Sequence, residues 1–215
     1  TNTINWMSVA FWRDHGIKRI ILSRELSIQE LQEIHTQVPD MELESFVHGS
    51  ICIAYSGRCL LSNYFNHRDA NQGTCTNSCR WEYNVQQEVP EGEQKTKSPE
   101  GNFFIEEKGR GGDLMPIDED EHGTYIMNSK DLRAIEHIDE LWNAGVESFK
   151  IEGRTKSIYY LSLITKTYRK AIDSMVASKP FDPELLRETE KTANRGFTTA
   201  FLLSGASRAT ERFDS

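Results

Sequence analysis

The feature that most constrains the fold of this chain is an alternation of helical and strand-like apolar patterns. Residues 5–15 carry apolar side chains at helical spacing and stop at Gly16, after which an apolar run begins at once. The same order returns at Gly145, where the apolar run 146–151 follows. This alternation indicates an α/β fold whose parallel sheet is covered by helices. A (β/α) barrel and an open doubly wound sheet both fit it.

Capping signals and periodicity predict the other elements. Ser27 and Glu30 form a capping box that opens a helix, and residues 41–47 read as the next strand. Ser129 is expected to cap a helix carrying Leu132, Ile135, Ile138 and Leu141 and ending at Gly145. A long helix is predicted over 157–175, and a last one from 182 toward 193.

In either architecture, chemistry belongs at the carboxyl ends of the strands. Those ends are predicted at residues 23–25, 48–50 and 152–154. The segment 146–170 holds six basic and two acidic residues, so a local basic face for an anionic substrate competes with an ordinary solvated helix face.

The chain divides by composition into four segments. Residues 1–81 and 122–203 carry the strand–helix units, and residues 204–215 read as a frayed tail. Residues 82–121 form a long acidic insertion, expected to be partly mobile and to hold a hairpin near 103–105. This insertion contains twelve acidic and four basic residues, which accounts for the whole formal charge of −8.

The chain has no apolar run long enough for a membrane span and no signal-peptide pattern at its start. Because it begins without Met, we expect a fragment of a longer cytoplasmic protein.

Four cysteines follow the strand that ends near Gly49. Six, fifteen and three residues separate Cys52, Cys59, Cys75 and Cys79 in turn. Disulfides are disfavoured in the cytosol, and the six-residue gap suits structural zinc poorly. An iron–sulfur cluster needs four thiolates and tolerates irregular loop spacing. The spacing therefore indicates metal binding, with iron favoured over zinc and buried cysteines as the remaining alternative.

Long sequence motifs add a family resemblance. The stretches ESFVHGSIC (44–52), GRCLLS (57–62) and NHRDANQGTCTNSCRWEY (66–83) are similar to the collagenase-like peptidase family of unclassified catalytic type. HGTYIMNSKDL (122–132) and FKIEGRTK (149–156) resemble its tRNA-hydroxylating branch. The similarity covers residues 6–201.

The resemblance implies an enzyme that forms 5-hydroxyuridine at the wobble position of tRNA. It implies a 4Fe-4S cluster on the four cysteines and prephenate as oxygen donor. It also implies that this chain is the C-terminal half of a TIM-like (β/α) barrel with a long insertion. A half-barrel leaves two sheet edges open, so association through those edges is expected.

The candidate site residues lie at strand ends. Glu44 and His48 are the catalytic candidates: Glu44 is expected to hold His48, Arg154 or a substrate group, or else to face outward. A hydrogen-bonded structural role is the alternative for His48. Substrate binding is predicted for Lys150, Glu152, Arg154 and Lys156, with an anion expected on Arg154 and Lys156 and a Lys/Glu surface pair as the alternative. Tyr159, Tyr160 and Tyr168 are candidates for stacking on bases, with core packing expected for at least one.

Two other functions stay open. A peptidase is what the family name suggests, but the chain has neither a G-x-S-x-G elbow nor an H-E-x-x-H helix. Four grouped thiolates also resemble ligands more than one activated nucleophile. The second alternative is a zinc-stabilised RNA-binding module.

Overall fold

The computed structural model describes residues 3–52, 54–56, 58, 59, 67, 130–154 and 156–203, together with the backbone of three strands within 103–126. These residues form two compact units. Unit 1 comprises residues 1–57 and 129–214, and unit 2 comprises residues 58–128 with residue 215. The four segment boundaries predicted from composition remain a prediction, and the predicted tail lies outside the described residues.

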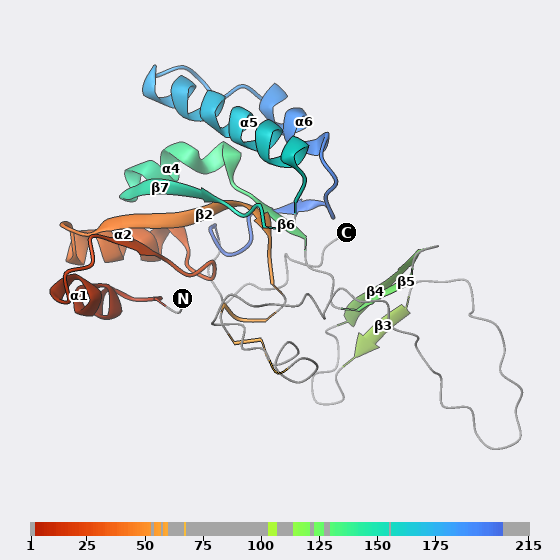
Figure 1. Cartoon of the computed structure of the whole chain (residues 1–215), viewed down its shortest axis with the longest axis horizontal. Helices are drawn as coiled ribbons and strands as arrows, with labels where there is room; N and C mark the ends of the chain where they lie inside the picture. The colour runs from red at the N-terminus through yellow and green to blue at the C-terminus, as the bar shows by residue number, and fades with distance from the viewer. Residues whose placement is uncertain are drawn as a thin grey trace, which may run out of the picture. The chain divides into compact units, whose positions relative to one another are not determined.

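Unit 1 is a mixed α/β layer (Figure 1). Its helices are α1 (Trp6–Asp14), α2 (Ile28–Gln37), α4 (Ile138–Asn143), α5 (Ile158–Val176) and α6 (Glu184–Glu190), with a 3₁₀ turn η3 (Ile135–His137) before α4. Its strands are β1 (Arg19–Ile21), β2 (Glu42–Ser50), β6 (Asp131–Arg133), β7 (Val146–Ile151) and β8 (Phe197–Thr198). The predicted α/β class is therefore correct.

The described sheet is open and mixed. Strand β2 pairs in parallel with β1 on one side and with β7 on the other. Near its end, β2 also pairs antiparallel with β6, which in turn pairs in parallel with β8. The prediction of a purely parallel sheet is thus wrong at β6, and the described strands do not close into a barrel.

Local signals explain the helix boundaries. The Asn5 side chain accepts from the Ser8 N–H at 2.9 Å and starts α1. The predicted capping box is present, because Ser27 and Glu30 satisfy each other's backbone at the start of α2. Ser157 accepts from the Tyr160 N–H at 3.1 Å and starts α5.

The prediction of a helix from Ser129 is wrong. Residues 131–133 form strand β6, and helical structure begins only at η3 and α4. The apolar spacing is real, since Leu132, Ile135, Ile138 and Leu141 are all buried. Strand pairing of β6 with β2 and β8 supplies backbone hydrogen bonds that override the local helical pattern.

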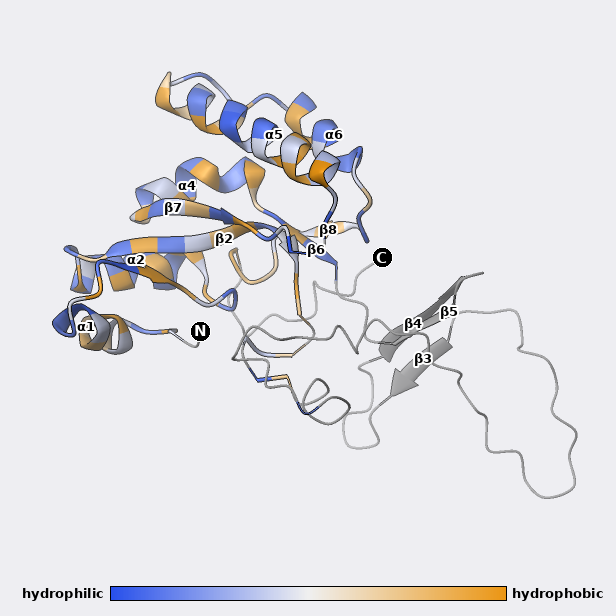
Figure 2. Cartoon of the chain, in the orientation of Figure 1, coloured by the Kyte–Doolittle hydropathy of each residue, from blue (hydrophilic) through white to orange (hydrophobic). Residues whose placement is uncertain are grey.

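The core of unit 1 is one continuous apolar cluster between the sheet and the helices. Strands contribute Leu43, Val47 and Val146, and helices contribute Leu31 and Ile164 among others. The amphipathic colouring of α5 follows this burial, with apolar residues on the side toward α4 (Figure 2). No described helix is long and apolar enough to cross a membrane.

Unit 2 contains an antiparallel three-stranded sheet of β3 (Phe103–Glu106), β4 (Leu114–Asp120) and β5 (Gly123–Ile126). The hairpin predicted near 103–105 corresponds to the pairing of β3 with β4.

Candidate functional site

The carboxyl ends of the three parallel strands meet at one edge of the sheet, as the sequence predicts. Arg24, after β1, donates from Nη1 to the carbonyl of Ser50 at 2.8 Å and from Nη2 to Glu152 Oε2 at 3.2 Å. The Glu152 N–H donates to the carbonyl of His48 at 2.8 Å. Arg24 thus joins the segments that follow β1, β2 and β7, although the first and the last are more than 100 residues apart in the sequence.

Gly49 permits this close approach. Its φ is +118°, a conformation that side chains rarely adopt. A Cβ atom at this position would lie 2.6 Å from the carbonyl oxygen of Glu152. The segment after β7 therefore packs directly against the backbone of β2.

Arg24 is a site residue that the sequence analysis did not select. Its side chain is 17% exposed, and its guanidinium carbon lies 3.9 Å from the centroid of the Phe46 ring. Burial lowers the pKa of Arg24, and Glu152 and Cys52 oppose that shift electrostatically. The signal in the sequence was only its place directly after a strand, in the segment 23–25.

Glu44 lies on β2 with its side chain 13% exposed. It accepts from Ser148 Oγ at 3.0 Å and from Lys150 Nζ at 3.0 Å. The expectation that an inward Glu needs a partner is met, but the partners are Ser148 and Lys150 instead of His48 or Arg154. Cross-strand register explains this pairing, because Glu44 lies opposite Ser148 in the sheet.

Lys150 Nζ also lies 5.5 Å from the centroid of the Phe46 ring. Lys150 is on β7 and Arg24 follows β1, so the two cations come from the two strands that pair in parallel with β2. Together these side chains form what we call the open-face cluster: Arg24, Glu44, Phe46, Ser148 and Lys150. The cluster offers cations beside one carboxylate and one aromatic ring, an arrangement that suits a planar or anionic ligand.

His48 is 1% exposed, with Nδ1 3.2 Å from Tyr168 Oη. The rings of Tyr160, Tyr168 and Phe197 lie 6.0, 5.4 and 5.6 Å from its ring. Burial lowers the pKa of His48 to about 4, with Asp131 opposing and Arg133 and Lys156 adding to the shift. The imidazole is therefore neutral at neutral pH, and its hydrogen bond agrees with the structural alternative.

A buried carboxylate organises the residues beyond His48. Asp131 is 2% exposed and accepts from Arg195 Nη2 at 2.6 Å, while Lys156 Nζ lies 3.9 Å away. Neither Asp131 nor Arg195 was predicted as functional. Asp131 was placed at the start of a predicted helix, where the structure instead forms strand β6.

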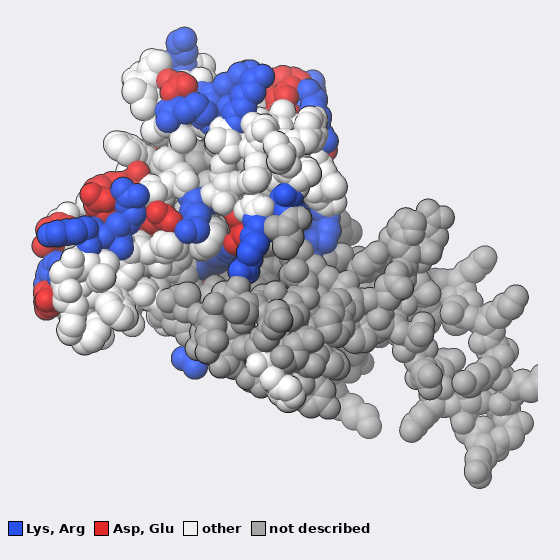
Figure 3. Space-filling view, viewed as in Figure 1, with Lys and Arg blue, Asp and Glu red and all other residues white. Residues whose placement is uncertain are grey.

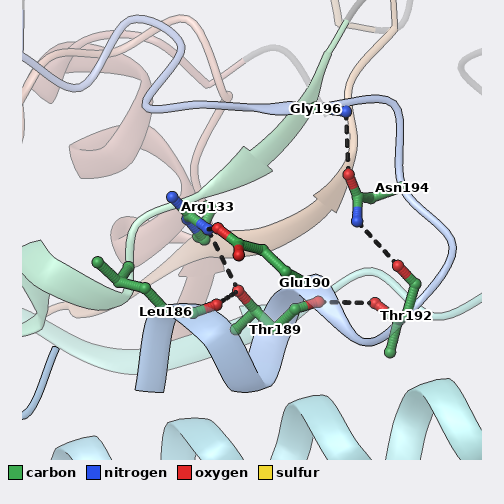
Figure 4. A network of polar contacts seen from close by, with 7 residues as sticks. All are labelled: Arg133, Leu186, Thr189, Glu190, Thr192, Asn194 and Gly196. Atoms are coloured by element: carbon green, nitrogen blue, oxygen red, sulfur yellow. Dashed lines mark hydrogen bonds and ion pairs between the residues drawn. The ribbon is translucent and has the colours of Figure 1, made fainter. Parts of the chain in front are cut away.

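A polar network fixes the segment that leads into β8 (Figure 4). Arg133 donates to Glu190 Oε1 at 3.2 Å and to Thr189 Oγ1 at 3.4 Å. Asn194 accepts from the Gly196 N–H at 3.0 Å, just before Phe197. The Arg133 guanidinium carbon lies 4.5 Å from the centroid of Phe197. This network holds Phe197 against His48.

Of the predicted substrate-binding residues, Lys150 lies on β7, and Glu152, Arg154 and Lys156 lie between β7 and α5. The Arg154 N–H donates to Glu152 Oε1 at 3.1 Å, and Lys156 Nζ lies 4.9 Å from the Tyr160 ring centroid. Tyr160 and Tyr168 are buried whereas Tyr159 is exposed, so core packing is confirmed for two of the three tyrosines. Farther along, α5 exposes Lys166, Arg169 and Lys170, and Figure 3 shows basic side chains over this helix.

Comparison with known proteins identifies the family. The model of peptidase family U32 matches residues 1–212. The chain belongs to peptidase family U32. It is 54% identical to tRNA hydroxylation protein P of Escherichia coli, covering 94% of this chain and 49% of that protein. It is 50% identical to the Haemophilus influenzae protein of that name, covering 94% and 48%.

A more distant relative is a 23S rRNA 5-hydroxycytidine synthase of Escherichia coli, 32% identical over 89% of this chain and 26% of that protein. The chain spans about half the length of the tRNA hydroxylation proteins that it matches. No solved structure matches it significantly.

Two cysteines of this U32 chain are described. Cys52 is half-buried in unit 1, two residues past β2 and within electrostatic reach of Arg24. Cys59 is buried and belongs to unit 2. Cys75 and Cys79 lie outside the described residues, and the described residues contain no cluster of three or more metal-ligating side chains. The four-thiolate site therefore remains a prediction.

Proposed function

We propose that this U32 protein is an enzyme that hydroxylates tRNA, forming 5-hydroxyuridine at the wobble position. Relatives at 54% and 50% identity are named tRNA hydroxylation proteins, and a more distant one is named as an rRNA hydroxycytidine synthase. Hydroxylation of RNA is the activity that these names share. The observation that carries the proposal lies at the carboxyl ends of the strands, where Arg24 is bonded to Glu152 and lies within electrostatic reach of Cys52.

The cofactor in this proposal is a 4Fe-4S cluster held by Cys52, Cys59, Cys75 and Cys79. Cys52 suits such a role, because it is a half-buried thiol beside a guanidinium that offsets the charge of a thiolate. When bound, a cluster of this kind supplies one-electron chemistry. Arg24 would hold the Cys52 segment through its bond to the Ser50 carbonyl.

Prephenate is the proposed oxygen donor, and tRNA is the proposed partner. The exposed cations of α5 would contact phosphates, which attract lysine and arginine without regard to sequence. The open-face cluster, with Lys150 beside Phe46, and the neighbouring residues Glu152, Arg154 and Lys156 would take the anionic or planar parts of the substrates.

The barrel architecture and the cytoplasmic location belong to the same proposal. Within the described residues, β1 and β7 each pair with β2 alone, which agrees with a half-barrel that continues beyond both edges. Association through those edges would complete the sheet.

A peptidase is the less favoured candidate. Among the described residues, His48 at the strand end is hydrogen-bonded to the phenol of Tyr168 and to no Ser, Thr or Cys nucleophile. Its depressed pKa, about 4, also makes it a weak general base at neutral pH.

The test is anaerobic purification of the intact protein with assays for iron, sulfide and zinc, beside Cys52→Ser and Ser45→Ala variants. We expect four iron and four sulfide per chain in the wild type and in Ser45→Ala, and a large loss in Cys52→Ser. Stoichiometric zinc without sulfide would contradict the 4Fe-4S cluster and support the zinc-stabilised RNA-binding module instead.

The RNA activity is tested separately by nucleoside analysis of a deletion strain. Hydroxylated wobble uridines should disappear and return with the wild-type gene but not with Cys52→Ser. Persistence of these nucleosides, with no redundant enzyme present, contradicts the tRNA assignment. Peptide cleavage that survives replacement of all four cysteines would instead support a peptidase.

A further inference from the structure

The turn between β1 and α2 is buried although it carries polar side chains. Ser23, Glu25 and Ser27 are 4%, 9% and 8% exposed. A carboxylate so far removed from water is costly unless its oxygens accept hydrogen bonds. The burial of Glu25 therefore makes its partners informative about the role of the turn.

Both carboxylate oxygens of Glu25 have a partner. Oε2 accepts from the hydroxyl of Ser23, which lies on the same turn. Oε1 accepts from the N–H of Ser56 at 2.8 Å, and Ser56 lies 31 residues farther along the chain. The second bond reaches the loop that follows β2, so Glu25 connects the end of β1 to the segment after Cys52.

The preceding residue, Arg24, holds the other side of the same loop. Its Nη1 donates to the carbonyl of Ser50 at 2.8 Å. Ser50 lies two residues before Cys52, and Ser56 lies four residues after it. Two consecutive residues of one turn thus contact the backbone on both sides of the cysteine. We call Arg24 and Glu25 the Cys52 clamp.

The turn that carries the clamp is itself anchored at three points. The Leu22 N–H donates to the carbonyl of Glu44 at 2.9 Å. The Ser23 N–H donates to the carbonyl of Thr3 at 3.2 Å. On the other side of the clamp, Ser27 begins the capping box of α2. A side chain on so constrained a backbone has few alternative positions, which is what a positioning residue requires.

The two members of the clamp also support each other electrostatically. Burial lowers the pKa of Arg24. Glu152 opposes that shift most strongly, followed by Cys52 and Glu25. Glu25 therefore favours the charged guanidinium that lies within electrostatic reach of Cys52, and such a charge stabilises a thiolate.

We propose that Glu25 is a positioning residue that holds the loop after Cys52, so that its thiolate is presented to a metal cluster. The point of attachment is the backbone N–H of Ser56, so the role needs an acceptor oxygen at position 25 and no contact with the metal. The cluster in this inference rests on the proposed function, whereas the attachment of the loop does not.

The test is the alkylation rate of Cys52 in the intact protein after a chelator has removed its metal. Trypsin cleaves after Arg24 and Arg58, so the peptide 25–58 contains Cys52 as its only cysteine. Mass spectrometry of this peptide after timed exposure to iodoacetamide measures the reactivity of Cys52 by itself.

We expect Glu25→Ala to raise the alkylation rate of Cys52 about tenfold, because the loop opens more often without its acceptor. Glu25→Gln keeps an oxygen for the Ser56 N–H and an amide that can donate to the Ser23 hydroxyl. Its rate should stay within about twofold of the wild type. If Glu25→Ala does not fold, Glu25→Asp takes its place, since the shorter carboxylate should also raise the rate.

Glu30→Ala is the matched control. Glu30 is the other carboxylate of this region, and it accepts from the Ser27 N–H at 2.8 Å. Its loss weakens the start of α2 but leaves the bond to Ser56, so the Cys52 rate should equal that of the wild type. Urea midpoints of Glu25→Ala and Glu30→Ala compare the two losses of stability.

Three results would overturn the proposal. One is an unchanged Cys52 rate when Glu25 is replaced by Ala, or by Asp where Ala does not fold. Another is an equal rise in Glu30→Ala, which would show a general loosening of the turn. The third is a rise in Glu25→Gln as large as in Glu25→Ala, because Gln keeps the acceptor oxygen.

Failure of this inference and failure of the proposed function give different results. In the anaerobically purified protein, Glu25→Ala should release iron to a chelator about tenfold faster than the wild type. A wild type without iron and sulfide, together with a raised Cys52 rate in Glu25→Ala, keeps the clamp and removes the cluster. A wild type with four iron, together with a Glu25→Ala variant that changes neither rate, keeps the cluster and removes the clamp.

Discussion

The two faces of strand β2 differ in the kind of side chains that pack against them. On one face Leu43 and Val47 are completely buried against helices, within the apolar core. On the other face Glu44 and Phe46 lie among Lys150, Arg24 and Ser148. The covered face supplies stability by removing apolar area from water. The open face supplies little stability for its charges, which is typical of a surface kept for binding.

The largest expected effect lies on the covered face. Leu43→Ala removes a fully buried side chain and should lower the free energy of unfolding by about 2 to 5 kcal/mol. Ile21→Ala, on the open face at 42% exposure, should cost less than about 1 kcal/mol. Urea denaturation of the intact protein measures both. Equal losses would show that the two faces are packed alike.

The next effect lies at the end of the strand. Gly49→Ala places a Cβ against the carbonyl of Glu152 and a side chain at a positive φ, for an expected loss of about 2 to 4 kcal/mol. Gly16→Ala is the matched control, since its φ is +83° with no atom near the added Cβ, and about 1 kcal/mol is expected. A similar small loss in both variants would mean that the backbone at Glu152 moves away from residue 49 at little cost, so that the close contact is not needed for stability.

A smaller effect depends on pH. His48 has its pKa lowered from 6.5 to about 4 by burial, so the unfolded chain binds a proton that the folded state does not. The resulting stability is present above pH 6.5 and is lost as pH falls toward 4.

Between pH 7.5 and pH 5, His48 should therefore account for a loss of about 2 kcal/mol in the free energy of unfolding. His48→Phe should lack this part of the pH dependence, while His15→Phe on the exposed surface should retain it. Urea unfolding at both pH values measures the difference. The same pH slope in His48→Phe and the wild type would contradict the buried neutral imidazole.

The smallest stability effect is expected on the open face itself. Glu44→Gln breaks the 3.0 Å ion pair with Lys150, whose side chain is 36% exposed, so solvent limits the loss to about 1 kcal/mol or less. A double-mutant cycle with Lys150→Met measures their coupling.

Activity of Glu44→Gln then sharpens the comparison. If Glu44 is catalytic, Glu44→Gln removes its charge and should lower the rate of tRNA hydroxylation on the order of 100-fold. Glu42→Gln is the control, because Glu42 lies two residues earlier on the same face of β2. Normal hydroxylation in Glu44→Gln would remove Glu44 from the candidates and leave it a structural partner of Lys150.

Much of the local structure was predictable because its signals act within a few residues. The capping box at Ser27, the cap at Ser157 and the stop at Gly16 all lie where the sequence predicts. The meeting of the strand ends was predictable as well, since parallel strands share one carboxyl edge.

The strand at 131–133 was not predictable from periodicity. Leu132 fits the apolar spacing of the following helix, yet its backbone pairs with Gly49 and Thr198. The sites of Asp131 and Arg195 were missed for that reason, because their 2.6 Å contact exists only once β6 and β8 are paired.

By itself, the sequence determined the helix caps, the strand–helix alternation, the spacing of the four cysteines and the residue types at the strand ends. The tertiary structure alone decided the partners: Lys150 for Glu44, Glu152 for Arg24 and Tyr168 for His48. Capping and periodicity depend on neighbours within one or two turns of the chain. Pairing across more than 100 residues depends on strand register and on which helix covers each face, and no local pattern encodes either.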